Sequence, residues 1–284
     1  IIKSYTYFMN VANHKSGKPL ASLDWLISHH EAKRDHRIAV VSKWPIRPGS
    51  KVLDIATGAG FWIPLIREKI GPAGSIYGID IEEDLLQQAV IRNPNMDGYA
   101  PYQVKLCDMN KLDFPKGSFD VVYAGNCYSY SNDTSKLIAK HSDFVKQNGI
   151  FIVRQWDNTA TIFSHVDADL LHEILFAACT NNINIGRFDN HMGRNLPSLF
   201  QDAKLSTYDL STDAIQFHAP LTTHEETYLR LKALWFAEQA SLNICASKLK
   251  IWLDYFEPSS SNYILNKSDF YFSTLEMQII WTKS

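Results

Sequence analysis

Between residues 50 and 156, short apolar runs alternate with segments whose apolar positions recur at helical spacing. The apolar runs predict strands in KVLDI, SIYGID, YQVKLCD, SFDVVYAGN and NGIFIVRQW. The intervening segments FWIPLIREKI, EEDLLQQAVIRN and DTSKLIAKHSDFVKQ are predicted to be helices. This alternation indicates βαβ units and a mainly parallel sheet with helices on both faces.

Outside this region the pattern is looser. Residues 20–47 are predicted to be helical, as are 166–181, 193–203 and a long region over about 222–256. KLSTYDLSTDAIQF and the final DFYFSTLEMQIIW are predicted to be strands. We find no internal repeat, and one elaborated α/β domain over residues 1–284 fits this order best.

Composition narrows the class of protein. Hydrophobic residues make up 45% and charged residues 20% of the 284 positions, which is ordinary for a soluble globular protein. The formal net charge of −2 disfavours a nucleic-acid partner, and the absence of a long apolar run predicts no membrane span. The four cysteines are widely spaced without a CxxC pair, so we expect free thiols in a reducing, cytoplasmic compartment. IIKSYTYFMN does not have the pattern of a signal peptide, and it lacks an initiator Met, so the native chain can begin earlier.

Polar residues follow four successive predicted strands. Asp54 is followed by the turn ATGAG, and Asp80, Asp108 and Asn126 occupy the ends of the next three strands. The carboxyl ends of parallel strands meet at one edge of a sheet, where ligands bind in this kind of fold. A carboxylate at Asp80 can accept hydrogen bonds from both hydroxyls of a ribose. Each feature alone also fits a helix cap or a structural turn, but the four together favour a nucleoside site.

The turn itself limits the kind of nucleoside. A pyrophosphate-binding turn usually has the pattern GxGxxG, whereas GAGFWI has no third glycine, and the P-loop sequence GK[ST] is absent. VLDIATGAGFW instead resembles the first motif of the class I S-adenosylmethionine-dependent methyltransferases, although Ala56 stands where glycine is common. YGIDIEEDLLQQA, LCDMNKLDFPKGSFDVVYAGNCYSY and FVKQNGIFIVRQW resemble the later motifs, and GRNLPSLFQDAKLSTYDL resembles the sixth-strand region of small-molecule members.

This resemblance implies a Rossmann-like sheet of seven strands in the order 3-2-1-4-5-7-6, with the last strand antiparallel and a helical cap. It implies an N-terminal helical lid over residues 1–47, a cofactor-binding core over 48–156, cap helices and the sixth strand over 157–268, and the final strand over 269–284. Tyr5 or Tyr7 of SYTYF is expected to close over the cofactor, with simple packing as the alternative. The implied cofactor contacts are Asp54, Ala56, Gly58, Gly60, Asp80, Ile81, Asp108, Met109, Asn126, Cys127 and Tyr7.

The implied chemistry is in-line displacement of a methyl group from S-adenosylmethionine, which needs orientation of the acceptor and no metal. A general base is needed only for a poorly acidic acceptor. The candidates are His165 and His191 in the region of the cap, with Trp156 at the predicted end of the fifth strand. We expect His141 to be structural, and His29 and His30 to lie on a solvated face.

Two enzyme functions stay open. The first is methylation of an oxygen, nitrogen or carbon atom of a small apolar acceptor, of the kind found in secondary metabolism. The second is a methyltransferase-like cyclase or pericyclase that binds the same cofactor. A nicotinamide-dependent dehydrogenase and a non-catalytic binding module are weaker alternatives. The sequence does not predict the acceptor or the oligomeric state.

Overall fold

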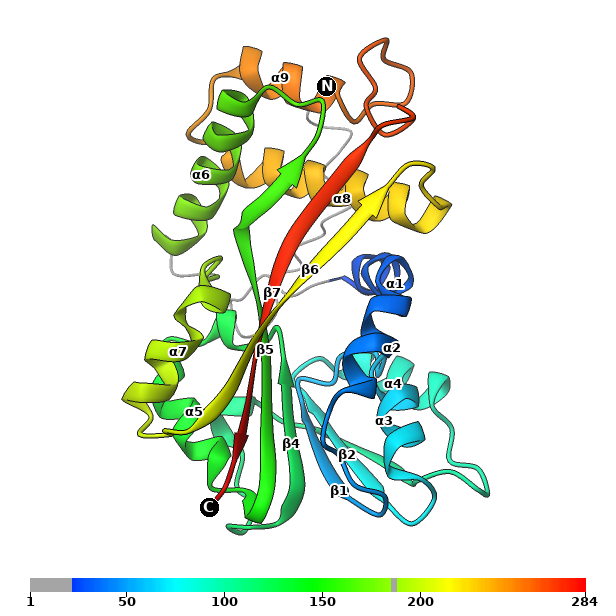
Figure 1. The fold of residues 1–284 in the computed structure, drawn as a ribbon, viewed down its shortest axis with the longest axis vertical. Helices are drawn as coiled ribbons and strands as arrows, with labels where there is room; N and C mark the ends of the chain where they lie inside the picture. Colours follow the sequence, from blue (N-terminus) through cyan, green and yellow to red (C-terminus); the bar gives the residue numbers. More distant parts are fainter. Residues whose placement is uncertain (1–21, 185–187) are drawn as a thin grey trace. The chain divides into compact units, whose positions relative to one another are not determined.

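The predicted alternation of strands and helices is present in the computed structural model, which describes residues 22–184 and 188–284 (Figure 1). The described helices and strands have the following bounds: α1 Leu23–Ala32, α2 Arg34–Ser42, β1 Lys51–Ile55, α3 Ile63–Ile70, β2 Ser75–Asp80, α4 Glu83–Arg92, β3 Tyr102–Leu106, η2 Met109–Lys111, β4 Phe119–Gly125, η3 Tyr128–Tyr130, α5 Thr134–Ser142, β5 Val145–Phe163, α6 Ala168–Asn184, α7 Met192–Asp202, β6 Tyr208–His218, α8 Thr223–Ala240, α9 Ala246–Asp254 and β7 Tyr271–Thr282.

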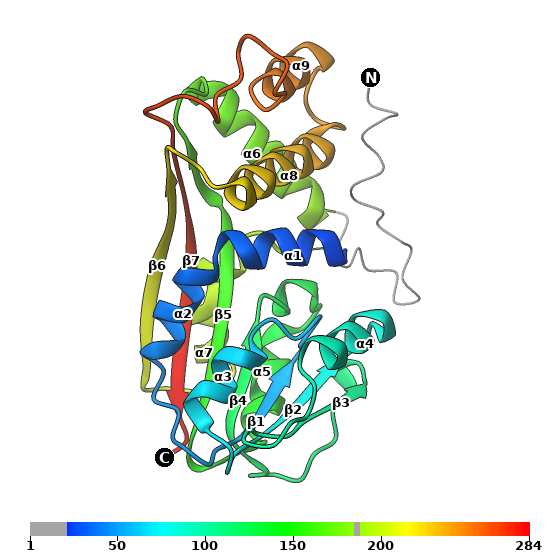
Figure 2. The same ribbon diagram turned by 90° about the vertical axis from the view of Figure 1, so that its right-hand side faces the viewer.

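The seven strands form one sheet in the order β3-β2-β1-β4-β5-β7-β6, as the sequence predicted. The pairs β1–β2, β1–β4, β2–β3 and β4–β5 are parallel, and β7 runs antiparallel to its neighbours (Figure 1). Figure 2 shows β6 and β7 side by side along their length. The expected Rossmann-like fold is therefore confirmed.

The chain forms two compact units. Unit 1 comprises residues 1–34, 156–191 and 213–276, and unit 2 comprises residues 35–155, 192–212 and 277–284. Strands β5, β6 and β7 each continue from one unit into the other. The expected divisions at 47, 156 and 268 stay a prediction.

Unit 2 has one hydrophobic cluster on each face of its sheet. Val52 packs with α2, α3 and α4, whereas its neighbour Leu53 packs with α5 and α7. Adjacent side chains of a strand point to opposite faces, so a continuous apolar run such as KVLDI fits a strand covered on both sides.

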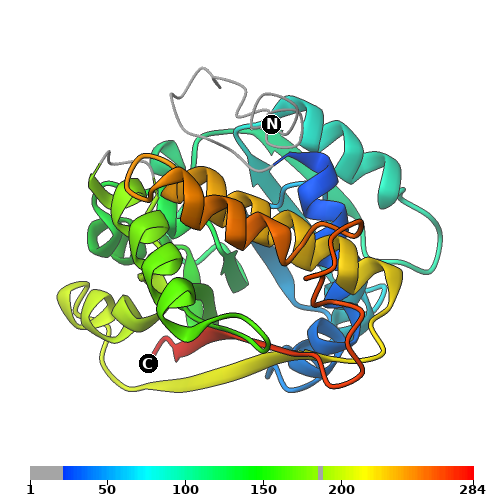
Figure 3. The same ribbon diagram turned by 90° about the horizontal axis from the view of Figure 1, so that it is seen from above.

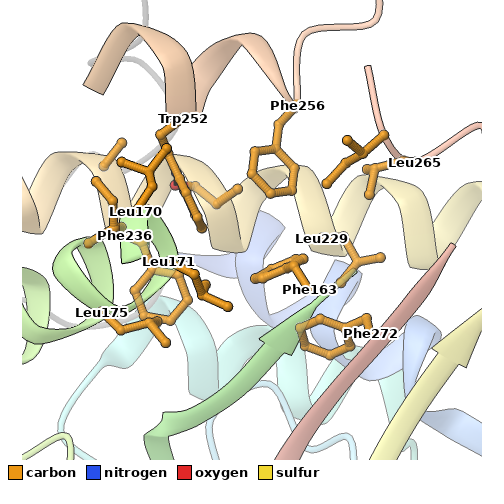
Figure 4. Close-up of a cluster of buried hydrophobic side chains, with 14 of the residues drawn as sticks. Phe163, Leu170, Leu171, Leu175, Leu229, Phe236, Trp252, Phe256, Leu265 and Phe272 are labelled. Carbon is orange, nitrogen blue, oxygen red and sulfur yellow. Dashed lines mark hydrogen bonds between the residues drawn. The ribbon is translucent and has the colours of Figure 1, made fainter. Parts of the chain in front are cut away.

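Unit 1 has a single large cluster built from α6, α8, α9 and the upper parts of β5, β6 and β7. Figure 3 shows α9 lying beside α8, and α6 also contacts α8. Helix α8 begins with a capping box in which Thr222 and Glu225 hydrogen-bond each other's backbone N–H groups. Figure 4 shows the aromatic part of the cluster, where Phe163, Phe272, Trp252 and Phe256 face one another.

Several predicted boundaries were wrong. The fifth strand does not end at Trp156 but runs from Val145 to Phe163, because β7 is its neighbour and continues to contact it, with the Thr161 and Thr274 hydroxyls 3.1 Å apart. The preceding helix consequently ends at Ser142. The helical regions over 20–47 and 222–256 are each divided into two helices.

Candidate active site

The turn after β1 has the backbone conformation that its small residues suggested. Ala56, Gly58 and Gly60 have φ values of 57°, 55° and 73°, in the left-handed region where glycine has no steric penalty. The Thr57 N–H donates to the Ile79 carbonyl at 2.9 Å, which ties the turn to the end of β2. A Cβ atom on Gly60 would lie 2.6 Å from Asn93 Nδ2, so close packing against α4 also requires glycine there.

Two carboxyl groups flank this turn. The Thr57 hydroxyl donates to Asp54 at 2.6 Å, and burial raises the pKa of Asp54 to about 7, with the charge of Asp80 adding to the rise. Asp80 accepts from the backbone N–H groups of Gly58, at 2.8 Å, and of Glu82, at 3.0 Å. Burial also raises the pKa of Asp80, against these hydrogen bonds, which favour the ionised form. A cation or hydroxyl donors beside these two acids would relieve the cost of their ionisation. Ile81 comes directly after Asp80 and is partly exposed.

Asp108 and Met109 lie after β3. Asp108 caps η2 by accepting from the Asn110 N–H at 2.9 Å. The Met109 carbonyl lies 3.0 Å from Nε2 of buried His141, whose Nδ1 lies 2.7 Å from the Tyr128 hydroxyl. Burial lowers the pKa of His141 to about 4, so the ring is neutral near pH 7 and its Nε2 proton is assigned to the bond with Met109. His141 therefore has the structural role that the sequence predicted.

Asn126 follows β4 in a left-handed conformation, with a φ of 55°, and its N–H donates to the Arg154 carbonyl at 2.8 Å. Its side-chain Oδ1 is buried and has no hydrogen-bond partner among the residues that the structure describes. Buried acceptors are rarely left without a donor, so this atom is a candidate ligand contact. Burial raises the pKa of the adjacent Cys127 thiol, which is therefore neutral.

Trp156 belongs to unit 1 and has a cationic environment. The ammonium groups of Lys33 and Lys232 lie 4.0 Å and 5.1 Å from the centre of a Trp156 ring. His29 packs edge-on against Trp156 with ring centres 4.6 Å apart. The expectation that His29 lies on a solvated face was wrong: the side chain is buried because α1 packs on α8, placing His29 beside Tyr228.

His165 and His191, the two candidate general bases, belong to unit 1 but are not among the side chains packed on Trp156. His165 is in an exposed turn after β5 with a φ of 62°, and its Nε2 lies 2.9 Å from the exposed Asp269. His191 is partly exposed, and its backbone N–H donates to Asp189 at 2.8 Å. The side chains packed on Trp156 are instead His29, Lys33 and Lys232. Tyr5 and Tyr7 lie outside the described residues.

A pocket of about 460 Å³ lies at the amino ends of β1 and β2, lined by Lys51, Tyr77 and Phe114 among others. Asp54 and Asp80 are near the carboxyl ends of these two strands, so the pocket is not at the candidate site. Within residues 22–184 and 188–284, no group of three or more His, Cys, Asp or Glu side chains is placed to hold a metal ion. No helix in that part of the chain is long and apolar enough to cross a membrane.

A family model for a methyltransferase domain matches residues 46–218, which contain the turn, both acids, Asn126 and Trp156. The chain belongs to this methyltransferase family. The resemblance of its motifs to the class I S-adenosylmethionine-dependent members is thereby confirmed.

Individual relatives agree with this assignment. Ubiquinone/menaquinone biosynthesis C-methyltransferases from Cupriavidus taiwanensis and Cupriavidus metallidurans are 30% and 31% identical to this methyltransferase over 153 and 155 residues. These matches cover 50% and 51% of this chain and 61% and 62% of the relatives, so the chain matches about three fifths of their length.

Solved structures share the fold at low sequence identity. The YcgJ protein of Bacillus subtilis has a TM-score of 0.55 at 14% identity, covering 88% of this methyltransferase and 98% of that chain. Phosphoethanolamine N-methyltransferase 2 of Haemonchus contortus, solved with phosphomonomethylethanolamine and S-adenosylhomocysteine, has a TM-score of 0.54 at 13% identity, covering 98% and 60%.

The described residues of unit 2 fit S-adenosylmethionine. Backbone N–H groups hold both oxygens of Asp80 in place, and carboxylate oxygens accept more than one hydrogen bond, so they suit ribose hydroxyls. Asn126 Oδ1 offers an acceptor that suits an ammonium group. The fit thus rests on the oriented carboxylate oxygens of Asp80 and on the unsatisfied amide oxygen of Asn126.

The sequence did not predict the buried lysines. Lys232 occupies the apolar face of α8, four residues after Tyr228 and four before Phe236. A lysine at that position of an apolar stripe was the available signal, because charged residues are rarely fully buried. For Lys33, Asn158 and Asn190 we find no signal in the sequence, since their surroundings come from segments far apart in the chain.

Proposed function

We propose that this protein transfers a methyl group from S-adenosylmethionine to an oxygen, nitrogen or carbon atom of a small organic acceptor. The observation that carries the proposal is the Asp80 carboxylate, whose two oxygens the backbone N–H groups of Gly58 and Glu82 hold in place. That arrangement lies within the matched family domain and presents two oriented acceptors. Two oriented acceptors on one carboxylate suit the two hydroxyls of a ribose.

The residues around the turn would bind and orient the cofactor. Asp80 would hold the ribose, Asp108 and Met109 the adenine, and Asn126 the methionine ammonium group. When bound, S-adenosylmethionine supplies a methyl group activated by the positive sulfonium. Orientation of the acceptor toward that methyl group contributes several kcal/mol to such a reaction, so the remaining task of the chain is to bind the acceptor.

The acceptor class is supported by the relatives. Two of them are named as C-methyltransferases of quinone biosynthesis, which makes carbon one candidate acceptor. We also propose that the cap region, residues 157–268, contributes to acceptor binding. Its support is the buried polar cluster of unit 1 around Trp156, Lys232 and Asn190.

Calorimetric titration with S-adenosylhomocysteine tests the cofactor site. We expect binding by the wild-type chain and a loss of roughly 100-fold in affinity for Asp80→Asn, because charge-assisted hydrogen bonds contribute about 1.5–3 kcal/mol each. Asp143→Asn is the matched control: Asp143 forms an exposed ion pair with Lys116 at 3.0 Å. Equal affinity of the Asp80 variant and the wild type would remove the basis of the proposal.

Transfer itself is measured with methyl-labelled S-adenosylmethionine and a set of phenols, enols, amines and carboxylic acids. Label in an acceptor product is expected. Consumption of an acceptor without label in its product would contradict methyl transfer.

A further inference from the structure

Two lysines are buried in unit 1. Lys33 follows α1 and Lys232 lies in the middle of α8, and each is only 1% exposed. A buried ammonium group is costly unless acidic groups and hydrogen-bond acceptors surround it. The partners of these two lysines therefore show whether the protein itself compensates the charges.

The described contacts compensate Lys33 better than Lys232. Lys33 forms a buried ion pair with Glu276 at 3.4 Å. The ammonium group of Lys232 instead donates to a neutral amide oxygen, Asn158 Oδ1, at 3.2 Å. Burial lowers the pKa of Lys232 to about 8, while Cys179 of α6 and Glu276 of β7 counteract part of that shift. Glu276 thus interacts with both ammonium groups, which lie beside the same indole ring.

The amide side chains next to Lys232 have a fixed direction. Asn158 presents its oxygen to the ammonium group, so its Nδ2 must donate onward, and it does so to Asn190 Oδ1 at 2.8 Å. The Asn158 N–H also donates to the Asn190 carbonyl at 3.0 Å, which holds the two residues together. In this chain of hydrogen bonds Asn190 accepts through Oδ1, and its Nδ2 donor group is not used.

Two of the buried donors around Lys232, on Asn190 and Trp156, lack an acceptor in the described part of the chain. Asn190 is 1% exposed, and its Nδ2 has no hydrogen-bond partner within the described part of the chain. The same holds for the buried Nε1 of Trp156, whose ring lies beside Lys33 and Lys232. A buried donor without an acceptor costs about 1–3 kcal/mol. The cluster around Trp156 therefore combines the buried ammonium group of Lys232, which donates to a neutral amide oxygen, with two unused N–H donors.

We propose that Lys232, Trp156 and Asn190 form a binding site for an anionic oxygen of the methyl acceptor. This inference rests on the proposed function and specifies its substrate class: an acceptor with a carboxylate, or with a phenol or enol that ionises on binding. An ammonium group and N–H donors in a buried site stabilise an oxyanion and lower the pKa of the bound acid. For a phenol or enol, the ionised form is also the better nucleophile, at oxygen or at the adjacent carbon.

The test uses 4-nitrophenol, whose phenolate absorbs visible light, and benzoate, both without cofactor. Binding of 4-nitrophenol to the wild-type chain is expected to lower its apparent pKa by about one unit, equivalent to a roughly tenfold preference for the phenolate. Lys232→Met is expected to abolish that preference, and Lys232→Arg to retain most of it. Benzoate binding that depends on Lys232, without 4-nitrophenol binding, would support the carboxylate as the source of the oxyanion.

Controls separate a local effect from misfolding and from failure of the cofactor site. Lys248→Met removes a half-exposed lysine of the same unit, ion-paired with Glu173, and should leave both probes unaffected. Trp156→Phe keeps the ring and removes the donor, and should weaken phenolate binding about fivefold even if Lys232→Met fails to fold. The proposal is overturned if neither probe binds, or if binding is the same in Lys232→Met, Trp156→Phe and the wild type. S-adenosylhomocysteine titration of the same samples reports the cofactor site independently.

Discussion

The polar groups buried around the turn of unit 2 differ from those buried around Trp156 in unit 1. Around the turn of unit 2 the carboxyl groups of Asp54 and Asp80 are buried, and Asn126 Oδ1 is an acceptor without a partner among the described residues. In the cluster around Trp156 in unit 1 the ammonium groups of Lys33 and Lys232 are buried, and Trp156 Nε1 and Asn190 Nδ2 are donors without a partner among the described residues. The first arrangement suits a ligand rich in donors and positive charge, and the second suits an anion.

The same physical effect operates in both units with opposite sign. Burial raises the pKa of Asp54 to about 7 and lowers the pKa of Lys232 to about 8, so both charges are disfavoured in the protein alone. A bound ligand of opposite charge would offset each penalty. A ligand is therefore expected where a buried charge lacks full compensation within the protein, whichever residue carries that charge.

The largest expected effect comes from measuring the Asp80 and Lys232 variants with both ligands, S-adenosylhomocysteine and 4-nitrophenolate. Asp80→Asn should reduce S-adenosylhomocysteine affinity about 100-fold and leave 4-nitrophenolate affinity within about twofold. Lys232→Met should reduce 4-nitrophenolate affinity about tenfold and leave S-adenosylhomocysteine affinity within about twofold. Calorimetry and absorbance titration on the same two proteins measure both. If either variant weakens both ligands equally, the two sites are not independent and the comparison fails.

Gly60→Ala tests how rigidly unit 2 holds its acceptors. The new Cβ would meet Asn93 at 2.6 Å in a residue whose φ is 73°, so the free energy of unfolding should fall by about 2–3 kcal/mol. Gly98→Ala is the control, because its φ is 83° but a Cβ there would meet nothing within 4 Å. That control should lose about 1 kcal/mol. Urea denaturation measures both, and equal losses would show that packing on α4 contributes nothing.

The Asp54→Asn variant tests the buried acid of unit 2 through the pH dependence of the free energy of unfolding. The folded pKa of Asp54 is near 7 and the ordinary value is near 4, so the folded state holds a proton that the unfolded state has lost between these values. Wild-type stability should consequently fall as pH rises from 4 to 7. The variant should be more stable than the wild type by about 2 kcal/mol at pH 8 and by almost nothing at pH 4. A constant difference across that range in urea denaturation would contradict the raised pKa.

Lys232→Met should change the pH dependence of stability in the opposite sense, and this is the smallest expected effect. The folded pKa is near 8 and the ordinary value near 10.5, so wild-type stability should rise as pH increases between these values. Below pH 8 the variant should be about 1 kcal/mol more stable than the wild type, since loss of the buried charge outweighs loss of the Asn158 hydrogen bond. The gain should disappear near pH 10.5. A destabilised variant at pH 7 would show that Lys232 is compensated by the protein alone.

The unit 2 site could be predicted from the sequence because its parts are local. Asp54, the turn and Asp80 lie within one βαβ unit, and the periodicity of KVLDI and SIYGID places them at strand ends. What could not be predicted is that Asp80 is already oriented by Gly58 and Glu82, since backbone hydrogen bonds of a turn are not visible in residue types.

The unit 1 cluster escaped prediction for the opposite reason. Lys33, Trp156, Asn190, Lys232 and Glu276 come from five separate segments, and no spacing in the sequence relates them. The strand that carries Trp156 was also ended too early, because DNTATIF lacks the apolar run that marks the first half of β5. Long-range pairing with β7, not local propensity, extends that strand.

The repeated passage of the chain between the two units limits where fragments of related genes can be joined. The chain passes from one unit to the other five times, and three of these passages fall inside β5, β6 and β7. A gene fragment that encodes residues 156–276 would therefore carry half-strands at its ends and would include residues 192–212 of the other unit. Chimeras that graft a new acceptor specificity should accordingly exchange residues 164–184 and 219–270, whose junctions lie beyond the strand ends, and retain all three long strands from one parent.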